Sequence, residues 1–198
     1  MNPDFWNERY EQESYVYGKA PNAFFRQELD KREAGHLLLP AEGEGRNAVY
    51  AARRGWQVMA FDQSEAGKEK AVALADSAGV ALDYMVSDVL SFTPEQPFDM
   101  VGLIYAHFPP EVRAAFHRKL SDWLRPGGII ALEAFHKDQL TLDSGGPKNE
   151  AMLYDPATLA SDFADLKLIA NDVCTLRLQE GTYHKGEASV VRTVAQKQ

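Results

Sequence analysis

Two glycines and one acid are spaced along residues 37–62 in a way that suits a nucleotide-like ligand. Gly43 and Gly45 lie between the apolar run HLLLP and a helical stretch, and Asp62 ends the next apolar run. Glycine lets the backbone approach a ligand closely, and the free N–H groups of a helix start attract a negative or polar group. A carboxylate at a strand end accepts hydrogen bonds from both hydroxyls of a ribose. This stretch therefore fits either a dinucleotide or S-adenosylmethionine.

A second acid extends the pattern. Asp88 follows the third apolar run, within VSDVLSF, and Val89 comes directly after it. The carboxylate can accept the amino hydrogens of an adenine, while Val89 supplies a backbone N–H and an apolar wall. The structural alternative is that Asp88 caps a turn or a helix. Acids at two successive strand ends favour one bound adenosine.

Three histidines are expected at the same edge of the fold. His107 follows the fourth predicted strand, His136 follows the fifth, and His184 lies in the turn of a C-terminal hairpin. A histidine can serve as a base, a hydrogen-bond donor or a metal ligand. These three have no short ligand spacing, so we predict no metal site and take His107 and His184 as catalytic candidates. His117 is interpreted as a helix-surface residue.

The first 35 residues are rich in aromatic side chains and are predicted to form a helical cap outside the sheet. We hypothesise that Trp6, Tyr10, Tyr15 and Tyr17 form a lid that excludes water and offers ring faces to a sulfonium. Tyr17 is counted with the two histidines as a catalytic candidate. The alternative is a satellite hydrophobic cluster that packs on the sheet.

From residue 36 onward, short apolar runs alternate with helical stretches. Strands are expected at 36–40, 56–61, 81–86, 98–105 and 129–135, and helices at 45–54, 64–77, 110–124 and 156–163. Such alternation is typical of a parallel sheet covered by helices. The runs 166–179 and 187–196 are joined by a segment too short for a crossover helix, so they predict an antiparallel hairpin at the sheet edge. We therefore expect an α/β, doubly wound, Rossmann-like domain over residues 36–198.

Composition bounds the classes of partner. The chain has 198 residues and a formal charge of −8, with no basic cluster, which disfavours nucleic acid as a substrate. No apolar run approaches the roughly 20 residues of a membrane span, and the N-terminus lacks a secretory pattern, so a cytoplasmic protein is expected. The expected partner is a small molecule.

Six segments together resemble the class I S-adenosylmethionine-dependent methyltransferases, in the branch that contains tellurite-resistance and thiopurine-type enzymes: WNERY, YVYGKAPNAF, EGEGRNAVYAARRGWQVMAFDQS, SDVLSF, FDMVGLIYAHFPP and WLRPGGIIALEAF. The resemblance covers nearly the whole chain. It implies a seven-stranded sheet whose last strand is reversed. It also implies contacts to the cofactor from Gly43 and Gly45 at the methionine portion, Asp62 and Gln63 at the ribose, Asp88 and Val89 at the adenine, and Tyr105 beside the amino-acid end.

One motif departs from the family pattern. Where the family often has Asp-Leu-Gly-Cys-Gly, this chain reads Leu-Pro-Ala-Glu-Gly over residues 39–43. Ala41 keeps a small side chain, and Glu42 is expected to replace the missing acid by pairing with the cofactor's ammonium group. An exposed loop carboxylate is the alternative for Glu42. Asn47, in the first helical turn, is expected to line the cofactor site or to cap the helix.

These observations favour a small-molecule methyltransferase that uses S-adenosylmethionine. A thiol or a chalcogen oxyanion is the expected acceptor, because such an acceptor needs less general-base help than an alcohol or an amine. Two alternatives stay open. The altered loop permits a non-catalytic S-adenosylmethionine-binding protein, and the glycine pattern permits an NAD(P)-dependent oxidoreductase.

Overall fold

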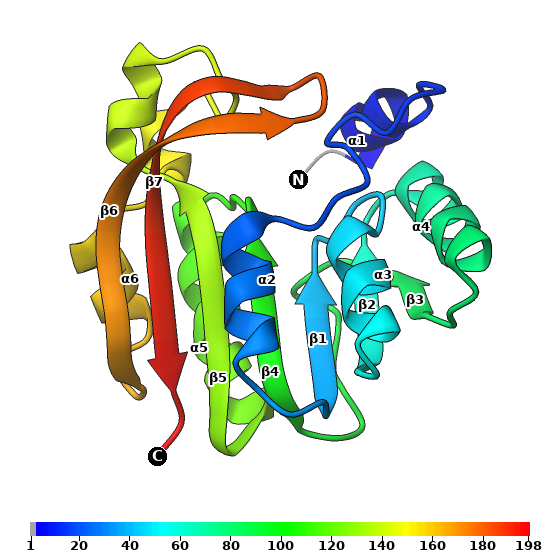
Figure 1. Ribbon diagram of the computed structural model, residues 1–198. Coiled ribbons are helices and arrows are strands. Elements are labelled where there is room, and N and C mark those ends of the chain that lie inside the picture. The colour runs from blue at the N-terminus through cyan, green and yellow to red at the C-terminus, as the bar shows by residue number, and fades with distance from the viewer. Residues whose placement is uncertain (1–2) are drawn as a thin grey trace.

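The computed structural model describes residues 3–198 and contains one seven-stranded sheet in the order β3-β2-β1-β4-β5-β7-β6 (Figure 1). The strands are β1 His36–Pro40, β2 Gln57–Asp62, β3 Asp83–Val86, β4 Phe98–Ile104, β5 Leu124–Phe135, β6 Lys167–Glu180 and β7 His184–Gln196. Strands β1 to β5 pair in parallel, whereas β7 runs antiparallel to both β5 and β6. The predicted fold class, the reversed last strand and the C-terminal hairpin are confirmed.

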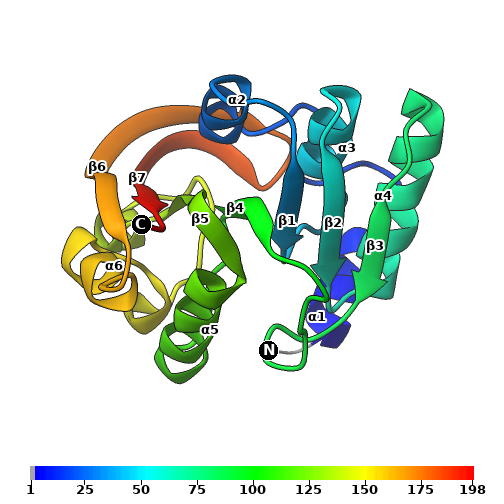
Figure 2. The ribbon, with the colours of Figure 1, turned by 90° about the horizontal axis from the view of Figure 1, so that it is seen from below.

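Helices cover both faces of the sheet (Figure 2). The helices are α1 Pro3–Tyr10, α2 Ala23–Asp30, α3 Arg46–Arg53, α4 Glu65–Ala78, α5 Pro110–Trp123 and α6 Pro156–Asp162, with short 3-10 turns at Lys137–Thr141 and Glu150–Met152. Helices α2, α3 and α4 lie on one face, and α5 and α6 lie on the other. None of the helices among the described residues is both long and apolar enough to span a membrane.

Local sequence explains where several helices begin. Ser64 accepts a hydrogen bond from the Gly67 N–H at the start of α4, and Asp155 caps α6 just before Pro156. Both are N-cap arrangements, and proline at the first helical position costs no hydrogen bond. The central strand β1 is apolar on both faces because helices cover it on both sides, and its three leucines are fully buried. These signals position the loops that leave the carboxyl ends of the strands.

The N-terminal segment differs from the predicted cap in its second half. Helix α2 packs into the main core through Phe24, Phe25 and Leu29, beside β1 and α3. An amphipathic helix with three buried apolar residues is stabilised by lying on the sheet, so α2 belongs to the helical layer. Within the N-terminal segment, only α1 and the loop that follows it lie over the carboxyl edge of the sheet (Figure 1).

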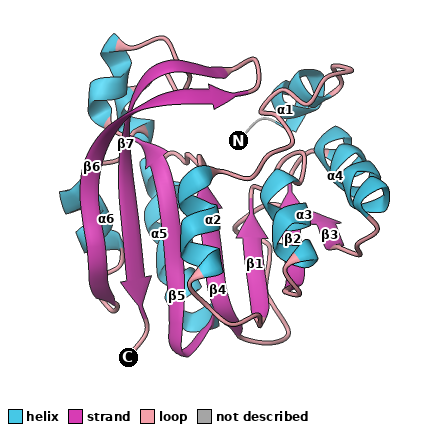
Figure 3. Cartoon of the chain, viewed as in Figure 1, coloured by secondary structure: helices cyan, strands magenta, loops and turns pink. Residues whose placement is uncertain are grey.

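The C-terminal hairpin is longer than its sequence pattern indicates. Its strands continue to Glu180 and from His184, so His184 is the first residue of β7 and does not lie in the turn. The tip curves over the carboxyl edge toward α1 (Figure 3). There the Thr182 N–H donates to the Val16 carbonyl at 2.8 Å, and Gln12 donates to the Tyr183 hydroxyl at 2.9 Å. The hairpin tip therefore closes against the N-terminal segment.

Strand β5 also begins earlier than predicted. The predicted strand covers residues 129–135, whereas β5 starts at Leu124 and includes Gly127 and Gly128. The pairing register with β4 shifts between Phe98 and Met100, which accommodates the positive φ of Gly127 (81°) inside the strand.

Gly45 is required by packing between two helices. It has a φ of +84° at the N-cap of α3, and a Cβ there would lie 2.6 Å from the Ala71 Cβ of α4. Gly79 has a similar φ of +67° at the end of α4, but a Cβ would meet nothing within 4 Å. Alanine would be strained in the left-handed backbone conformation at both positions, but it would clash with a neighbouring residue only at position 45.

We expect Gly45→Ala to lower the free energy of unfolding by about 2–4 kcal/mol and Gly79→Ala by about 1 kcal/mol. Urea denaturation of both variants measures the difference. Equal losses would show that backbone conformation alone, and not the contact between α3 and α4, requires glycine at residue 45.

Candidate functional site

A cavity of about 540 Å³ lies at the carboxyl edge of the parallel strands, where such sheets bind ligands. Its wall includes the residues that follow β1, β2, β3 and β4, together with parts of α1 and the C-terminal hairpin. Most of the predicted site residues line it: Tyr17, Ala41, Glu42, Asn47, Asp62, Gln63, Asp88, Val89, Tyr105, His107 and His184. Gly43 and Gly45 are absent from this wall.

Asp62 is buried at the end of β2 and organises the loop after β1. Its carboxylate accepts hydrogen bonds from the N–H groups of Gly43 at 3.1 Å and Ser64 at 3.0 Å. Burial raises the pKa of Asp62 to about 6, although these backbone donors act to lower it. Each carboxylate oxygen has a further lone pair, so Asp62 can still accept hydrogen bonds from a ligand in the cavity.

The side-chain amide of the neighbouring Gln63 has a buried hydrogen-bond donor that no other described residue uses. Its side-chain Nε2 is buried and has no hydrogen-bond partner among the described residues, although Gln63 lines the cavity. A buried amide donor without a partner is costly, and such groups commonly await a ligand or water. Gln63 is therefore suited to donate to a ligand oxygen beside Asp62.

Asp88 lies on the same cavity wall and also stabilises its own turn. Its exposed carboxylate accepts the Leu90 N–H at 2.8 Å, as the turn-cap alternative predicts. Val89 is buried at 4% exposure and faces the cavity, as an apolar wall requires. Asp62 and Asp88 thus line the same cavity.

Gly43 and Gly45 support the site from behind its wall, and the structure shows other reasons for glycine there. A Cβ at Gly43 would lie 2.5 Å from the Tyr10 hydroxyl, and its carbonyl accepts the Tyr84 hydroxyl at 2.6 Å. Gly45 packs against α4, as described above. Close packing with protein, not an opening toward the cavity, accounts for both residues.

Among residues 3–198, two residues other than glycine have left-handed backbone conformations, and both line the cavity. Ala41 follows β1 with φ 52°, and Tyr105 follows β4 with φ 54°. Such conformations cost energy for residues with a side chain and are concentrated at functional sites. Ala41 stands where the family pattern has its first glycine, so the backbone keeps the conformation that the glycine would favour.

Glu42 is a helix cap, and the expected exposed-carboxylate alternative is wrong. One oxygen accepts the N–H groups of Asn47 and Ala48, each at 2.8 Å, and the other accepts the Asn47 amide at 3.3 Å. Gly45, the N-cap of α3, has no side chain for this purpose. Burial raises the pKa of Glu42 to about 7 despite these donors. Glu42 also lines the cavity, and its predicted pairing with an ammonium group stays a prediction.

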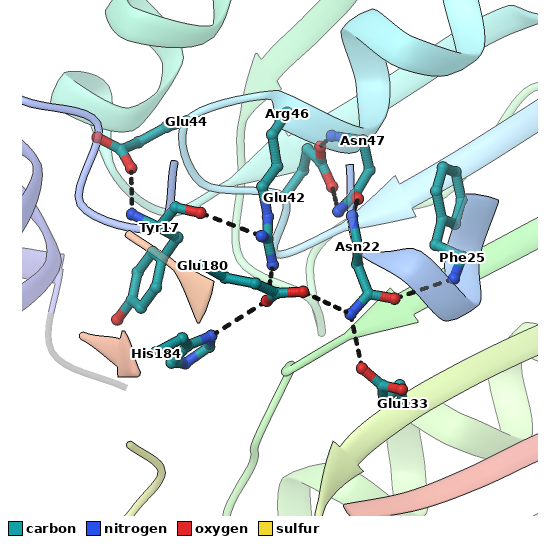
Figure 4. A network of polar contacts seen from close by, with 10 residues as sticks. All are labelled: Tyr17, Asn22, Phe25, Glu42, Glu44, Arg46, Asn47, Glu133, Glu180 and His184. Carbon is teal, nitrogen blue, oxygen red and sulfur yellow. Dashed lines mark hydrogen bonds and ion pairs between the residues drawn. The ribbon is translucent and has the colours of Figure 1, made fainter. Parts of the chain in front are cut away.

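A buried polar network joins the loops around the cavity (Figure 4). Asn22 donates to Glu133 at 2.6 Å and to Glu180 at 3.2 Å, and its backbone N–H donates to Asn47 at 2.9 Å. Arg46 donates to Glu180 at 2.9 Å. The Asn47 amide thus donates to Glu42 and accepts from Asn22, and these contacts give Asn47 a structural role.

His107 is held by the backbone on both sides of its ring. Nδ1 lies 2.7 Å from the Met152 carbonyl, and Nε2 accepts the Phe135 N–H at 3.2 Å. These contacts require a neutral ring with the proton on Nδ1. Burial lowers the pKa of His107 to about 4. His107 thus has no free lone pair for a base and instead joins β4, β5 and the loop that contains Met152.

His184 and Tyr17 are in contact at the other side of the cavity. Their ring centroids are 4.5 Å apart, and the Tyr17 hydroxyl accepts a hydrogen bond from Arg9 at 3.0 Å. Burial raises the pKa of Tyr17 and lowers that of His184. Tyr17 is therefore a neutral phenol at pH 7, whereas His184 is a neutral imidazole that can accept a proton.

The hypothesised aromatic lid is present in part. Trp6, Tyr10 and Tyr17 line the cavity, and Trp6 stacks on Tyr10 with centroids 5.5 Å apart. Tyr15 lies outside the wall, where its hydroxyl donates to the Lys70 carbonyl at 2.9 Å. Whether these rings move as a lid stays a hypothesis.

Sequence reasoning missed several wall residues. Phe135, Pro147 and Met152 line the cavity from the end of β5 and the loop after it. That loop leaves the same edge of the sheet as the predicted site, which is the signal that could have identified it. His117 was placed wrongly on a helix surface: it is fully buried, and its Nδ1 lies 2.9 Å from Asp162. The described residues contain no group of three or more side chains suited to hold a metal ion.

The pKa of Glu42 predicts how stability depends on pH. Because burial raises this pKa from 4.5 to about 7, Glu42 stabilises the fold fully below pH 4.5, and this contribution is lost as pH rises toward 7. We expect the free energy of unfolding to fall by about 2–3 kcal/mol across this range on account of Glu42. Glu42→Gln keeps an acceptor for the cap and removes the titration, so its stability profile should be flatter. Urea denaturation at pH 5 and pH 8 measures the free energy of unfolding of both proteins. An equal change in this free energy between the two pH values would contradict the prediction.

Comparisons with known proteins agree with this geometry. Residues 40–128 match the family described as "Methyltransferase domain". A search of curated proteins found no match. The structure is similar to that reported under "Conversion of a Disulfide Bond into a Thioacetal Group during Echinomycin Biosynthesis", with 19% identity and a TM-score of 0.77 over 98% of this chain and 91% of that one.

Two further solved structures have the same architecture. The magnesium protoporphyrin IX methyltransferase of Synechocystis PCC 6803 with bound S-adenosylhomocysteine is 15% identical, with a TM-score of 0.75 over 99% of this chain and 97% of that one. TehB of Haemophilus influenzae is 13% identical, with a TM-score of 0.73 over 99% of this chain and 67% of that one. The chain thus matches a methyltransferase domain over residues 40–128 and has, from end to end, the fold of S-adenosylmethionine-dependent methyltransferases.

Proposed function

We propose that this protein transfers a methyl group from S-adenosylmethionine to a small molecule held in the same cavity. The observation that carries the proposal is the shared cavity of Asp62 and Asp88 at the carboxyl edge of the parallel strands. The methyltransferase-domain match spans the segments that contain both acids. A cofactor with a ribose and an adenine would occupy the positions that these acids face.

The residues present fit this cofactor. Asp62 would accept from the ribose hydroxyls and the unpartnered Gln63 amide would donate to them, whereas Asp88 and Val89 would hold the adenine. The methionine portion would lie between Ala41 and Tyr105, the two strained loop residues. Bound there, the cofactor supplies an activated methyl group on a sulfonium.

The remaining wall would hold the acceptor and exclude water. Trp6, Tyr17, Phe135 and Met152 give it a largely apolar and aromatic surface. Methyl transfer is an in-line displacement, so alignment of donor and acceptor in a dry site accounts for much of the catalysis. A cavity of about 540 Å³ suits a cofactor together with a small acceptor.

We propose a soft acceptor, a thiol or a chalcogen oxyanion, and place the protein in the branch of tellurite-resistance and thiopurine-type enzymes. Two facts support this class. The apolar wall suits a polarisable atom, and one structure with the same fold is reported for the conversion of a disulfide bond into a thioacetal. The formal charge of −8 argues against nucleic acid as the substrate, and we propose a cytoplasmic location.

Calorimetric titration with S-adenosylhomocysteine and with NADH tests the cofactor assignment. Asp62→Asn should weaken S-adenosylhomocysteine binding roughly 10- to 100-fold, because charge-assisted hydrogen bonds contribute about 1.5–3 kcal/mol. Asp83→Asn is the matched control, since Asp83 is exposed at the opposite end of the neighbouring strand. Binding of NADH alone would instead favour an oxidoreductase. Tight S-adenosylhomocysteine binding without methylation of any thiol, selenite, tellurite or small amine would favour a non-catalytic binding protein.

A further inference from the structure

The acceptor side of the cavity contains two polar atoms that lack partners. The Tyr105 hydroxyl and Nδ1 of His184 are buried and have no hydrogen-bond partner at ordinary geometry among residues 3–198, although Glu133 acts on Tyr105 and Glu180 on His184. Both residues line the cavity, and their ring centroids are 4.4 Å apart. Unpaired polar atoms beside a cavity cost free energy that a bound ligand can recover. The Tyr105 hydroxyl therefore indicates where a polar or ionisable acceptor group would lie, whereas Nδ1 of His184 lies toward Glu180.

Aromatic rings fix the plane of the His184 imidazole. The centroids of Tyr17, Tyr105 and Phe135 lie 4.5, 4.4 and 5.3 Å from that of His184. The imidazole Nδ1 lies 3.6 Å from Oε2 of Glu180 (Figure 4). This separation exceeds an ordinary hydrogen bond. A small closing movement would complete the contact.

Glu180 is itself held in place as a carboxylate. Arg46 donates to its Oε2 at 2.9 Å, and Asn22 donates to its Oε1 at 3.2 Å. Burial acts to raise the pKa of Glu180, but His184 and Arg46 together hold it below the ordinary value. A carboxylate facing Nδ1 directs the imidazole proton to that nitrogen, which leaves Nε2 as the proton acceptor.

The charges around His184 keep the imidazole neutral. Burial lowers its pKa, Glu180 and Glu133 act to raise it, and Arg46 lowers it. The titratable and charged groups that face His184 are Tyr17, Arg46, Tyr105, His107, Glu133 and Glu180. The net shift is downward, so His184 is unprotonated at neutral pH and ready to accept a proton.

We propose that His184 is the general base of the methyl transfer, that Glu180 is its positioning residue, and that the acceptor is a small thiol. This inference rests on the function proposed above. A thiol keeps most of its proton at neutral pH, with a pKa of about 8.5, and an imidazole can remove it. Ionised chalcogen oxyanions have no proton to lose before attack, so a general base would not assist their methylation. The Tyr105 hydroxyl donates to the sulfur as its charge develops.

The proposed step balances in protons and electrons. The S–H bond breaks, the proton passes to Nε2 of His184, and the bonding pair stays on the thiol sulfur. That pair forms the new bond to the methyl carbon, while the bond from the methyl group to the sulfonium breaks and its pair stays on the departing thioether. The proton is then released to water. The products are a methyl thioether, S-adenosylhomocysteine and one proton.

Two thiols of different acidity test the base. 2-Mercaptoethanol is mainly protonated at neutral pH, and 4-nitrobenzenethiol is mainly thiolate. His184→Asn should lower kcat for 2-mercaptoethanol about 100-fold or more, and for 4-nitrobenzenethiol less than about 10-fold, because a thiolate needs no base. His136→Asn is the control, since His136 lies outside the cavity wall and asparagine preserves its capping of the Lys137–Thr141 turn. Equal losses for both thiols, or methylation of selenite or tellurite but of neither thiol, would overturn the proposal.

The role of Glu180 is tested without turnover. In Glu180→Gln, the pKa of His184 measured by NMR in the cofactor-free protein should fall, because the carboxylate that raises it is gone. The acid limb of kcat/KM for 2-mercaptoethanol should move to lower pH by the same amount. Glu187→Gln, at an exposed acid on β7, should leave both unchanged. An unaltered pKa and an unaltered acid limb would overturn the positioning role.

Cofactor affinity separates this inference from the proposed function. His184→Asn should bind S-adenosylhomocysteine as the unmodified protein does, since His184 lies on the acceptor side of the cavity. If His184→Asn binds S-adenosylhomocysteine normally and turns over 2-mercaptoethanol at an unchanged rate, His184 is not the base, and the proposed function still stands. Failure of the unmodified protein to bind S-adenosylhomocysteine defeats the proposed function and, with it, this inference.

Discussion

Several carboxylates, among them Asp62, Glu42, Glu133 and Glu180, are withdrawn from water at one edge of the sheet, and each must be paired. Asp62 and Glu42 are satisfied mainly by backbone N–H groups, whereas Glu133 and Glu180 meet Arg192, Arg46 and Asn22. An unpaired charge in such a place would cost several kcal/mol. Glu133 and Glu180 belong to β5 and β6, and their partners come from β7, α3 and the segment before α2, so pairing these acids also joins the elements around the cavity. The same pairs therefore stabilise the fold and position the residues of the site.

This constraint gives the two halves of the cavity different characters. On the cofactor side, Asp62 and Glu42 use backbone donors, so their positions depend on the path of the chain after β1 and β2. On the acceptor side, the acids are paired with other side chains. The Tyr105 hydroxyl and Nδ1 of His184 have no hydrogen-bond partner at ordinary geometry among the described residues. The cofactor side, positioned by the backbone, suits a ligand that does not change. The acceptor side can be altered by changing a few side chains, which suits the part of a site that selects its substrate.

Strain and close packing are also concentrated at this edge. Ala41 and Tyr105 have left-handed backbones at the ends of β1 and β4, and Gly45 admits α4 against α3. These features bring α3 and both loops toward one point. The N-terminal helix α1 and the tip of the C-terminal hairpin then meet above them, joined by contacts such as that of Gln12 with Tyr183. Segments from opposite ends of the chain thus form the roof of the cavity.

The sequence by itself determined the order of strands and helices, the hairpin, and the two acids that end neighbouring strands. These depend on local periodicity, caps and turn residues, which act over a few positions. Tertiary structure alone decided what each side chain does. Asn22 meets Glu133 across 111 positions, and the backbone groups that occupy both nitrogens of His107 lie 28 and 45 positions away. No local pattern encodes such pairings, because they depend on how separate elements pack and on which buried polar atoms then find partners.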